Sequence, residues 1–442
     1  MSHPDPERVD SWVASMAEDL GSLDLLRHLL DCPSCAARVQ DRLNAPSASE
    51  LHGASIDYSQ IWTRVLDRAR SAEARARRVR GQALERVEEL LATPPASRLE
   101  RVRRERRFAH RAIAEQALAT IRSQPERMED LARIALAITE GLPERRHLPA
   151  VRVSLLASAR CHLAEALRAE GLLDRAESEL EKVALPTELS DALERARYCR
   201  VLGAVRRDRG RLDEALALFG RAVDLYEDLR EVEALAEVRL AIGSLYLELF
   251  DARRAQAVFE SVLQEPQPIS ASHVVRAIQG RVMALLLADG TESALRALDE
   301  AAANCPWSPE STEALTLLAL RGRVELSAGH AEAARDALTR ALQGLSRSGE
   351  ALEAAHAGAA LALLYFRQNE SQKERLDLAG LLDMLSTAGV PFEVELSLVG
   401  LRNGLRQGSL PPRRLRHLLA AIEHHRDLDP SRYFSLRRNM IH

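Results

Sequence analysis

The chain has 442 residues, which is too long for one small core, so we expect two or three domains or an extended repeat array. It is 46% hydrophobic but only 4% aromatic, and it is rich in Ala, Leu, Arg and Glu, a composition that favours helices over strands and predicts an all-α protein. The net charge of −4 excludes a protein built to coat nucleic acid, and the lack of a long uninterrupted apolar run excludes a transmembrane helix.

The compartment can be predicted from the first residues and the cysteines. The opening MSHPDPERVD is acidic and polar, unlike a secretion signal. The five cysteines are odd in number, and three of them, Cys161, Cys199 and Cys305, stand alone in the sequence. We therefore expect no disulfide framework and a reducing, cytoplasmic location, with these three thiols serving as small core residues.

The first chemical pattern in chain order is RHLLDCPSC, where His28, Cys32 and Cys35 have the spacing H-x3-C-x2-C. This spacing puts nitrogen and sulfur donors on one side of the segment, as tetrahedral zinc requires. Of the candidates for a fourth ligand, His3 is the best, because a helical hairpin turning near residues 19–22 would bring it back. A thioredoxin-like redox pair would need a preceding strand, which the sequence lacks; a domain that has lost its metal and keeps its cysteines for packing stays an alternative.

The segments MSHPDPERVDSW and RHLLDCPSCAARV resemble the zinc-associated anti-sigma domain of bacteria. The resemblance implies a small helical domain at residues 1–43 that binds Zn2+ through His3, His28, Cys32 and Cys35 and wraps around a sigma factor. In some members of that family, cysteine oxidation expels the zinc and releases the partner. Many members also carry a transmembrane helix after the zinc domain; its absence here indicates a soluble version, or a zinc domain kept for another partner.

The charge of the N-terminal region is mildly consistent with such a partner. Residues 1–57 contain ten acidic residues against four arginines, and the DNA-binding surface of a sigma factor is basic. Residues 44–57, which begin NAPSASELHGAS, are rich in Pro, Ser and Gly and are predicted to be a linker.

A long helix is predicted next. Apolar residues recur every three or four positions from 61 to 90, and TPP at 93–95 should end the helix after roughly 30 residues. Its alanine-rich middle would let a neighbouring helix approach closely. Residues 64–111 contain fifteen arginines against seven acidic residues. Because Arg replaces Lys almost everywhere in this chain and stacking aromatics are missing, we interpret them as a solvated helix face and expect no direct nucleic-acid contact.

A repeat follows, and it is the strongest architectural signal. Small residues recur in steps of 39 or 40 at Ala176, Ala215, Ala255, Ala294 and Ala334. Four residues after each stands a bulky one: Leu180, Phe219, Phe259, Leu298 and Leu338. Twelve residues before the Ala, most units have another small residue: Ala164, Gly203, Gly243 or Gly322. We interpret this pattern as helical hairpins in which Gly or Ala faces Ala, while Phe or Leu fills the groove of the next pair.

The repeat resembles the tetratricopeptide repeat, although its period exceeds that family's usual 34 residues. The extra residues fall between hairpins, around VDLYEDLREVEAL, so helices there should be about a turn longer. Gly171, Gly210 and Gly329 should each end a first helix in the left-handed conformation. A divergent hairpin at 99–141, with PERMEDLARIALAI as its second helix, and a further unit at 352–388 should extend the array.

The predicted fold is a small zinc-binding helical domain followed by a tetratricopeptide-like, right-handed α-solenoid. We divide the chain into the zinc domain (1–43), the linker (44–57), the long helix with a first divergent hairpin (58–150), the repeats (151–390) and C-terminal capping helices with a tail (391–442).

We find no phosphate-binding loop, nucleophile elbow or zinc-protease motif, so we expect no enzyme activity. The concave side of stacked repeats binds peptides or partner helices. The sequence therefore predicts a regulatory interaction protein, a soluble zinc-dependent anti-sigma-like factor whose solenoid docks a second protein or peptide. The alternatives are a scaffold or adaptor, or a peptide-sensing regulator, in which the zinc domain is purely structural. No membrane partner is expected.

Overall fold

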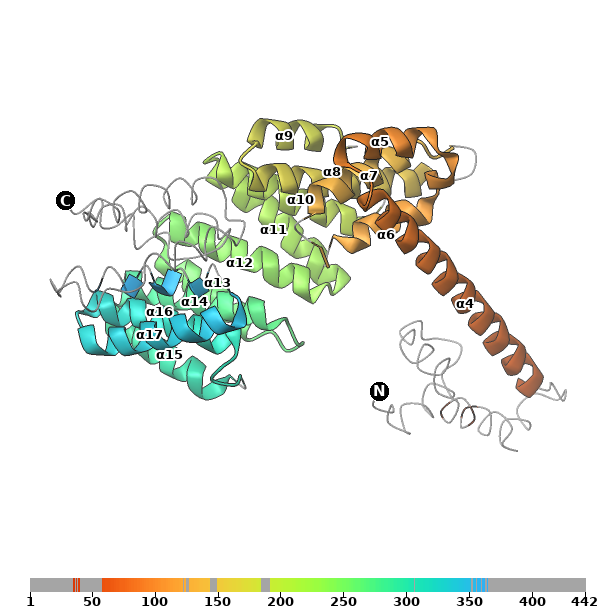
Figure 1. The fold of residues 1–442 in the computed structure, drawn as a ribbon. Helices are drawn as coiled ribbons and strands as arrows, with labels where there is room; N and C mark the ends of the chain where they lie inside the picture. The colour runs from red at the N-terminus through yellow and green to blue at the C-terminus, as the bar shows by residue number, and fades with distance from the viewer. Residues whose placement is uncertain are drawn as a thin grey trace. The chain divides into compact units, whose positions relative to one another are not determined.

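The computed structural model describes residues 58–121, 123–124, 127–143, 149–183, 191–305 and 307–350, together with Cys35, Ala37, Val39 and eight residues between 353 and 364. Throughout these residues every regular element is a helix, which confirms the all-α prediction (Figure 1). The chain divides into two compact units, residues 1–159 and 160–442, and the division falls within helix α8 (Pro149–Ala169).

The first unit contains the predicted long helix, α4 (Tyr58–Leu91), which is 34 residues long (Figure 1). It ends before Pro94 and Pro95, as expected, and α5 (Pro95–Arg104) begins there. Ala83, Val87 and Leu90 are buried, and this end of α4 packs against α6 (Arg111–Thr120). From residue 70 to 82 the helix is exposed except for the half-buried Glu73, so the described residues include no neighbouring helix against its alanine-rich middle.

The remaining helices of the first unit form a compact core. The 3-10 turn η3 (Arg106–Phe108) follows α5, and α7 (Met128–Glu140) packs against both α5 and α6. Phe108 of η3 and three α7 side chains, Leu131, Ile134 and Ile138, are almost fully buried. The α7 helix falls within PERMEDLARIALAI and its continuation, which confirms that this segment is helical.

The second unit is a series of helical hairpins, seen in Figure 1 as paired helices from α8 to α17. In the first hairpin, α8 is followed by α9, and Arg160 of α8 forms an ion pair with Glu179 of α9. Later helices pair as α10 with α11, α12 with α13, α14 with α15 and α16 with α17. Their bounds are α9 Leu173–Glu181, α10 Ala192–Asp208, α11 Leu212–Leu229, α12 Val232–Glu248, α13 Ala252–Leu263, α14 Ala271–Ala288, α15 Thr291–Asn304, α16 Thr312–Ala328 and α17 Ala331–Ser348.

Neighbouring hairpins share their cores. One cluster joins Phe219 and Tyr226 of α11 to Leu235 and Val238 of α12, the first helix of the next hairpin. Another cluster joins α12 and α13 to α14 in the same way. Since each hairpin completes the burial of the one before it, the unit is a tetratricopeptide-like solenoid, as predicted.

The role predicted for the small residues needs one correction. The glycine of the first helix faces the bulky residue of the second helix, not its alanine. A β-carbon added to Gly203 would lie 2.8 Å from the Phe219 ring, and one added to Gly243 would lie 2.7 Å from the Phe259 ring. Phe259 also touches the next hairpin, where a β-carbon on Gly280 would lie 2.3 Å from its ring. The glycines are therefore sockets for aromatic rings.

The turns within the hairpins follow one pattern. Gly171, Gly210 and Gly329 have φ between 74° and 87°, which confirms their predicted left-handed conformation. At Gly210 the amide of Arg211 reaches back to the Arg206 carbonyl at 2.8 Å, the long bond of a Schellman motif. In the third hairpin the same turn is made by Phe250, which has φ 58° and is 52% exposed.

The longer helices are confirmed between the second and third hairpins, where α11 has 18 residues and α12 has 17. In the next repeat, α13 has only 12 residues, and the residues beyond the usual repeat length lie in the connection between α13 and α14. Most of the predicted unit at 352–388 and both helices predicted at 391–442 lie outside the described residues. None of the helices in the described ranges is long and apolar enough to cross a membrane.

Candidate functional site

The second unit contains a cavity of about 510 Å³ on the face formed by its first helices. Residues from α8, α10, α12, α14 and α16 all contribute to its wall, together with Phe219 of α11 and with Glu353. We call this cavity the groove. Its charged wall residues number four arginines and four glutamates: Glu165, Arg168, Arg200, Arg207, Glu237, Arg276, Glu313 and Glu353.

Arg200 is the central charge of the groove wall. Its guanidinium donates two parallel hydrogen bonds to Glu165 of α8, at 2.8 and 2.9 Å, and a third to Glu237 of α12 at 2.9 Å. Burial acts to raise the pKa of Glu165, but the charge and hydrogen bonds of Arg200 outweigh it and lower that pKa to about 2. Arg200 thus joins three successive first helices through charge-assisted hydrogen bonds.

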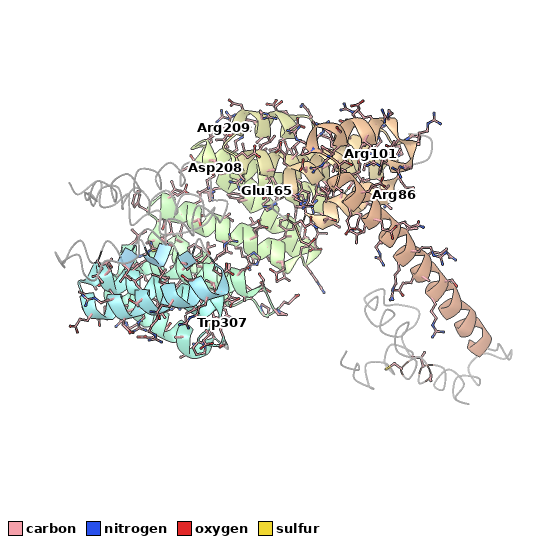
Figure 2. All side chains as sticks on the ribbon, in the orientation of Figure 1. Arg86, Arg101, Glu165, Asp208, Arg209 and Trp307 are labelled. Atoms are coloured by element: carbon pink, nitrogen blue, oxygen red, sulfur yellow. The ribbon has the colours of Figure 1, made fainter. Side chains whose placement is uncertain are left out.

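A second charged cluster contains two further arginines of the groove wall. Arg168 of α8 donates to one Asp208 oxygen at 2.7 Å, and Arg207 of α10 donates to the other at 3.1 Å. Both arginine side chains are only 7% exposed. Figure 2 labels Glu165 and Asp208, the acceptors of the two clusters, in the same part of the second unit. Three arginines are therefore paired with acids inside the protein.

Between these charged residues the groove wall consists of apolar side chains, two of which are small alanines. Ala204 of α10 and Ala241 of α12 are half-buried and leave space, while Phe219 and Val275 are buried. Gln279 of α14 also lines the groove and is only 8% exposed. Within the part of the chain that the structure describes, no protein group forms a hydrogen bond with its side-chain amide. The amide oxygen and nitrogen are not sealed from solvent, so they can bond water or a ligand in the groove.

A serine, a histidine and a glutamate meet at the start of α14, and their geometry argues against a catalytic triad. The Nδ1 atom of His273 lies 2.7 Å from the Ser270 hydroxyl and 2.6 Å from a Glu233 carboxylate oxygen. A triad needs the serine and the acid on opposite ring nitrogens, whereas here both share one. The other Glu233 oxygen accepts the backbone N–H of Ser270 at 2.7 Å, so the cluster ties the start of α14 to α12.

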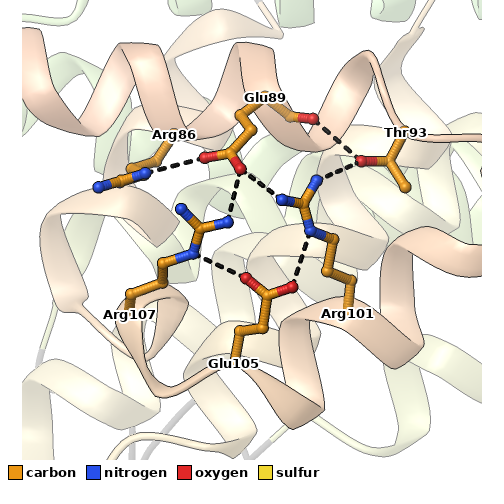
Figure 3. Close-up of polar contacts among 6 residues, drawn as sticks. All are labelled: Arg86, Glu89, Thr93, Arg101, Glu105 and Arg107. Atoms are coloured by element: carbon orange, nitrogen blue, oxygen red, sulfur yellow. Dashed lines mark hydrogen bonds and ion pairs between the residues drawn. The ribbon is translucent and has the colours of Figure 1, made fainter.

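Part of the arginine-rich segment of the first unit is held in a closed ion-pair network, shown in Figure 3. Glu89 of α4 accepts hydrogen bonds from Arg86, Arg101 and Arg107, while Glu105 accepts from Arg101 and Arg107. The hydrogen bond from Arg86 and the charges of the other arginines lower the pKa of Glu89. These arginines fix the corner between α4, α5 and η3.

The predicted zinc ligands fall mostly outside the described residues, which include Cys35 but not His3, His28 or Cys32. Cys35 and Val39 are buried helical residues one turn apart, while Ala37 between them is exposed, so the thiol lies on the inward face of its helix. Two imidazoles and two thiols form a donor set that suits tetrahedral zinc. Elsewhere, the described ranges contain no cluster of three histidine, cysteine or acidic side chains placed for a metal.

The three isolated cysteines occupy core positions. Cys161 and Cys199 are buried in α8 and α10, and Cys305 is half-buried after α15, against the core of α14 to α16. Burial raises the pKa of all three thiols, which keeps them protonated near neutral pH. This confirms their prediction as small core residues.

The groove residues could not be recognised from the sequence. Arg200 stands three positions before Gly203, and Gln279 occupies the same register position in α14, where Val282 replaces the small residue. The other first helices have Cys161, Leu240 and Ala319 at this position, so no recurring polar residue signals the groove in the sequence. The pairing of Arg200 with Glu165 and Glu237 spans 35 and 37 residues, and no pattern within one helix reveals it.

Comparisons with known proteins found one family match and similar solved structures. Residues 193–264 match the family model of the tetratricopeptide repeat. The crystal structure of BtubC (BKLC) from P. vanneervenii is 15% identical, covering 63% of this chain and 93% of that one, with a TM-score of 0.32. The apo form of the quorum sensor NprR from B. thuringiensis is 12% identical, covering 74% and 97%, with a TM-score of 0.41.

No curated protein matches the chain. The family match begins one residue inside α10 and ends one residue past α13, so it covers two complete hairpins of the second unit. These two hairpins of the second unit are therefore similar to tetratricopeptide repeats.

Proposed function

We propose that this chain is a regulatory interaction protein and that the groove of its second unit binds a peptide or a segment of a partner protein. The observation that carries the proposal is that five successive first helices line one cavity of about 510 Å³. This volume lies within the range of sites that hold small ligands and anchoring side chains. The proposal involves no catalytic step.

The position of the groove also supports an interaction role. The inner helices of stacked repeats offer a continuous surface to which an extended segment can bind along several units. The half-buried alanines at 204 and 241 leave open space that larger side chains would fill. Binding residues held on packed helices need little reorganisation when a ligand arrives.

The test is a selection of phage-displayed random 12-residue peptides on the full chain, followed by affinity measurements with Ala241→Arg. This arginine should block the groove and abolish binding of the selected peptides. Ala257→Arg on the exposed face of α13 is the matched control and should bind normally. Failure to select any peptide, or equal binding by both variants, would overturn the proposal.

We further propose that residues 1–43 bind zinc and hold a sigma factor, so that the chain acts as an anti-sigma-like regulator. Support comes from the H-x3-C-x2-C spacing, the acidic N-terminal region and the inward-facing Cys35. The four side chains His3, His28, Cys32 and Cys35 would hold the metal, which would supply structural cross-linking to a segment too small for its own core.

This second proposal can fail without affecting the first. The full chain, prepared under reducing conditions, should contain one zinc per molecule and should retain a sigma factor encoded by the same genome. Cys32→Ser should lose both properties and leave peptide binding by the groove unchanged. Zinc without any sigma-factor binding would favour a scaffold with a purely structural metal domain.

A further inference from the structure

Gln279 marks the chemistry of the groove's occupant. A primary amide donates and accepts hydrogen bonds at the same time, as does a peptide group. Within the described residues no protein group bonds its amide, which is open to the groove although the residue as a whole is only 8% exposed. A ligand that offers a peptide N–H and C=O would pair with both ends of this amide in place of water.

The groove wall has no net charge that would attract a strongly charged occupant. Its four arginines are balanced by four glutamates in the wall, and Asp208 adds one further acid beside Arg168 and Arg207. Arg200 already makes three hydrogen bonds to carboxylates. A phosphate or carboxylate ligand would have to compete with these internal acids and meet the unpaired-charge cost of displacing them.

The apolar part of the wall gives the ligand its anchor. Ala204 and Ala241 border open space, and Phe219 and Val275 offer apolar surface beside it. An aliphatic side chain that enters this space would exchange its hydration shell for contact with carbon atoms, which stabilises the complex through the hydrophobic effect.

We infer that the groove binds an extended, uncharged peptide segment, with an aliphatic side chain between Ala204 and Ala241 and a backbone peptide group on Gln279. This inference rests on the proposed peptide-binding function and specifies its ligand. An extended segment fits better than a helix, because the middle of a helix has already paired its N–H and C=O groups, whereas an extended backbone offers both to Gln279.

The composition of the peptides selected on the full chain tests this inference. Peptides that depend on the groove, by loss of binding to Ala241→Arg, should be enriched in aliphatic residues and have a net charge near zero. If groove-dependent peptides are instead enriched in acidic or in basic residues, the inference is wrong while the proposed peptide-binding function stands. If no groove-dependent peptide is found, both fail.

The role of Gln279 has its own test. Gln279→Leu keeps the size of the side chain but removes the amide, and it should weaken binding of a selected peptide by about 2- to 10-fold. The same peptide with the amide nitrogen next to its anchoring residue methylated should bind wild type more weakly and Gln279→Leu without further loss. The control Gln82→Leu removes an amide from an exposed face of α4 and should bind normally.

Two outcomes would overturn the role of Gln279. One is wild-type affinity in Gln279→Leu, since the amide would then contribute no bond to the ligand. The other is an equal effect of peptide methylation on wild type and on Gln279→Leu, since the methylated nitrogen would then bind elsewhere. Thermal unfolding of each variant, followed by circular dichroism, should give the wild-type midpoint and so separate lost binding from lost folding.

Discussion

The glycine sockets for Phe259 make a sharp prediction about stability. In Gly280→Ala the new β-carbon would lie 2.3 Å from the Phe259 ring, more than an ångström closer than ordinary contact. The ring has no room to retreat, because Gly243 already lies against it from the other helix, where a β-carbon would be 2.7 Å away. Backbone displacement between α12, α13 and α14 is the remaining response.

The magnitude follows from two opposing effects. Overpacking a filled core costs about 1–3 kcal/mol, and the tightness of this contact places the cost near the upper end. Replacing glycine by alanine inside a helix gains about 1 kcal/mol. We therefore expect Gly280→Ala to lower the free energy of unfolding by about 1–2 kcal/mol. Gly220→Ala in α11 provides the control, because nothing lies within 4 Å of its β-carbon, and it should stabilise by about 1 kcal/mol.

The assay is urea denaturation followed by circular dichroism, with the midpoint compared among wild type and the two alanine variants. Phe259→Leu in the Gly280→Ala background should cost less than Phe259→Leu alone, because the smaller side chain relieves the overlap. If Gly280→Ala proves as stable as Gly220→Ala, the socket argument is refuted, since the higher helix propensity of alanine would then explain the stability of both variants.

Other predictions concern the ion pairs, the turns and the metal. Glu165→Gln should destabilise the chain at pH 7, by less than the roughly 3 kcal/mol of a fully buried pair because Glu237 still faces Arg200. The folded pKa of Glu165 is below its unfolded value, so its stabilisation is full above about pH 4.5 and is lost as the pH falls toward 2; the unfolding midpoints of variant and wild type should converge over that window. Phe250→Gly should stabilise by about 1 kcal/mol in urea denaturation, since glycine adopts positive φ without strain; an unchanged midpoint would mean that the exposed ring offsets the strain through its contacts. Chelation of zinc from the full chain should remove the metal detected by mass spectrometry and leave the midpoint of the second unit unchanged; a shift of that midpoint would show that the metal supports the repeats.

The repeats could be predicted from the sequence because their determinants are local. The alanines at 176, 215 and 255 and the glycine turns each specify a hairpin within about 40 residues. The partner of each glycine could not be predicted, because Gly203 and Phe219 lie on different helices whose rotation depends on the whole stack. The exposure of α4 between residues 70 and 82 could not be predicted for a related reason: an apolar stripe shows that a helix can be covered, not that a neighbour covers it.

The groove was harder still to predict. Its charge balance depends on pairs such as Arg200 with Glu237, whose members are dozens of residues apart and in different hairpins. From the sequence alone, both look like ordinary charged residues on helix surfaces. Only the stacking of first helices puts them against one wall, and the same stacking places Gln279 in that wall with only 8% of the residue exposed.

The hydrogen bonds of Arg200 also affect how fast a ligand can bind. Because one guanidinium holds α8, α10 and α12 together, spreading these helices apart would break charged hydrogen bonds to Glu165 and Glu237 together. That end of the groove is therefore already shaped before any ligand arrives. Its association rate should be independent of any opening step, and different ligands should vary mainly in how quickly they leave.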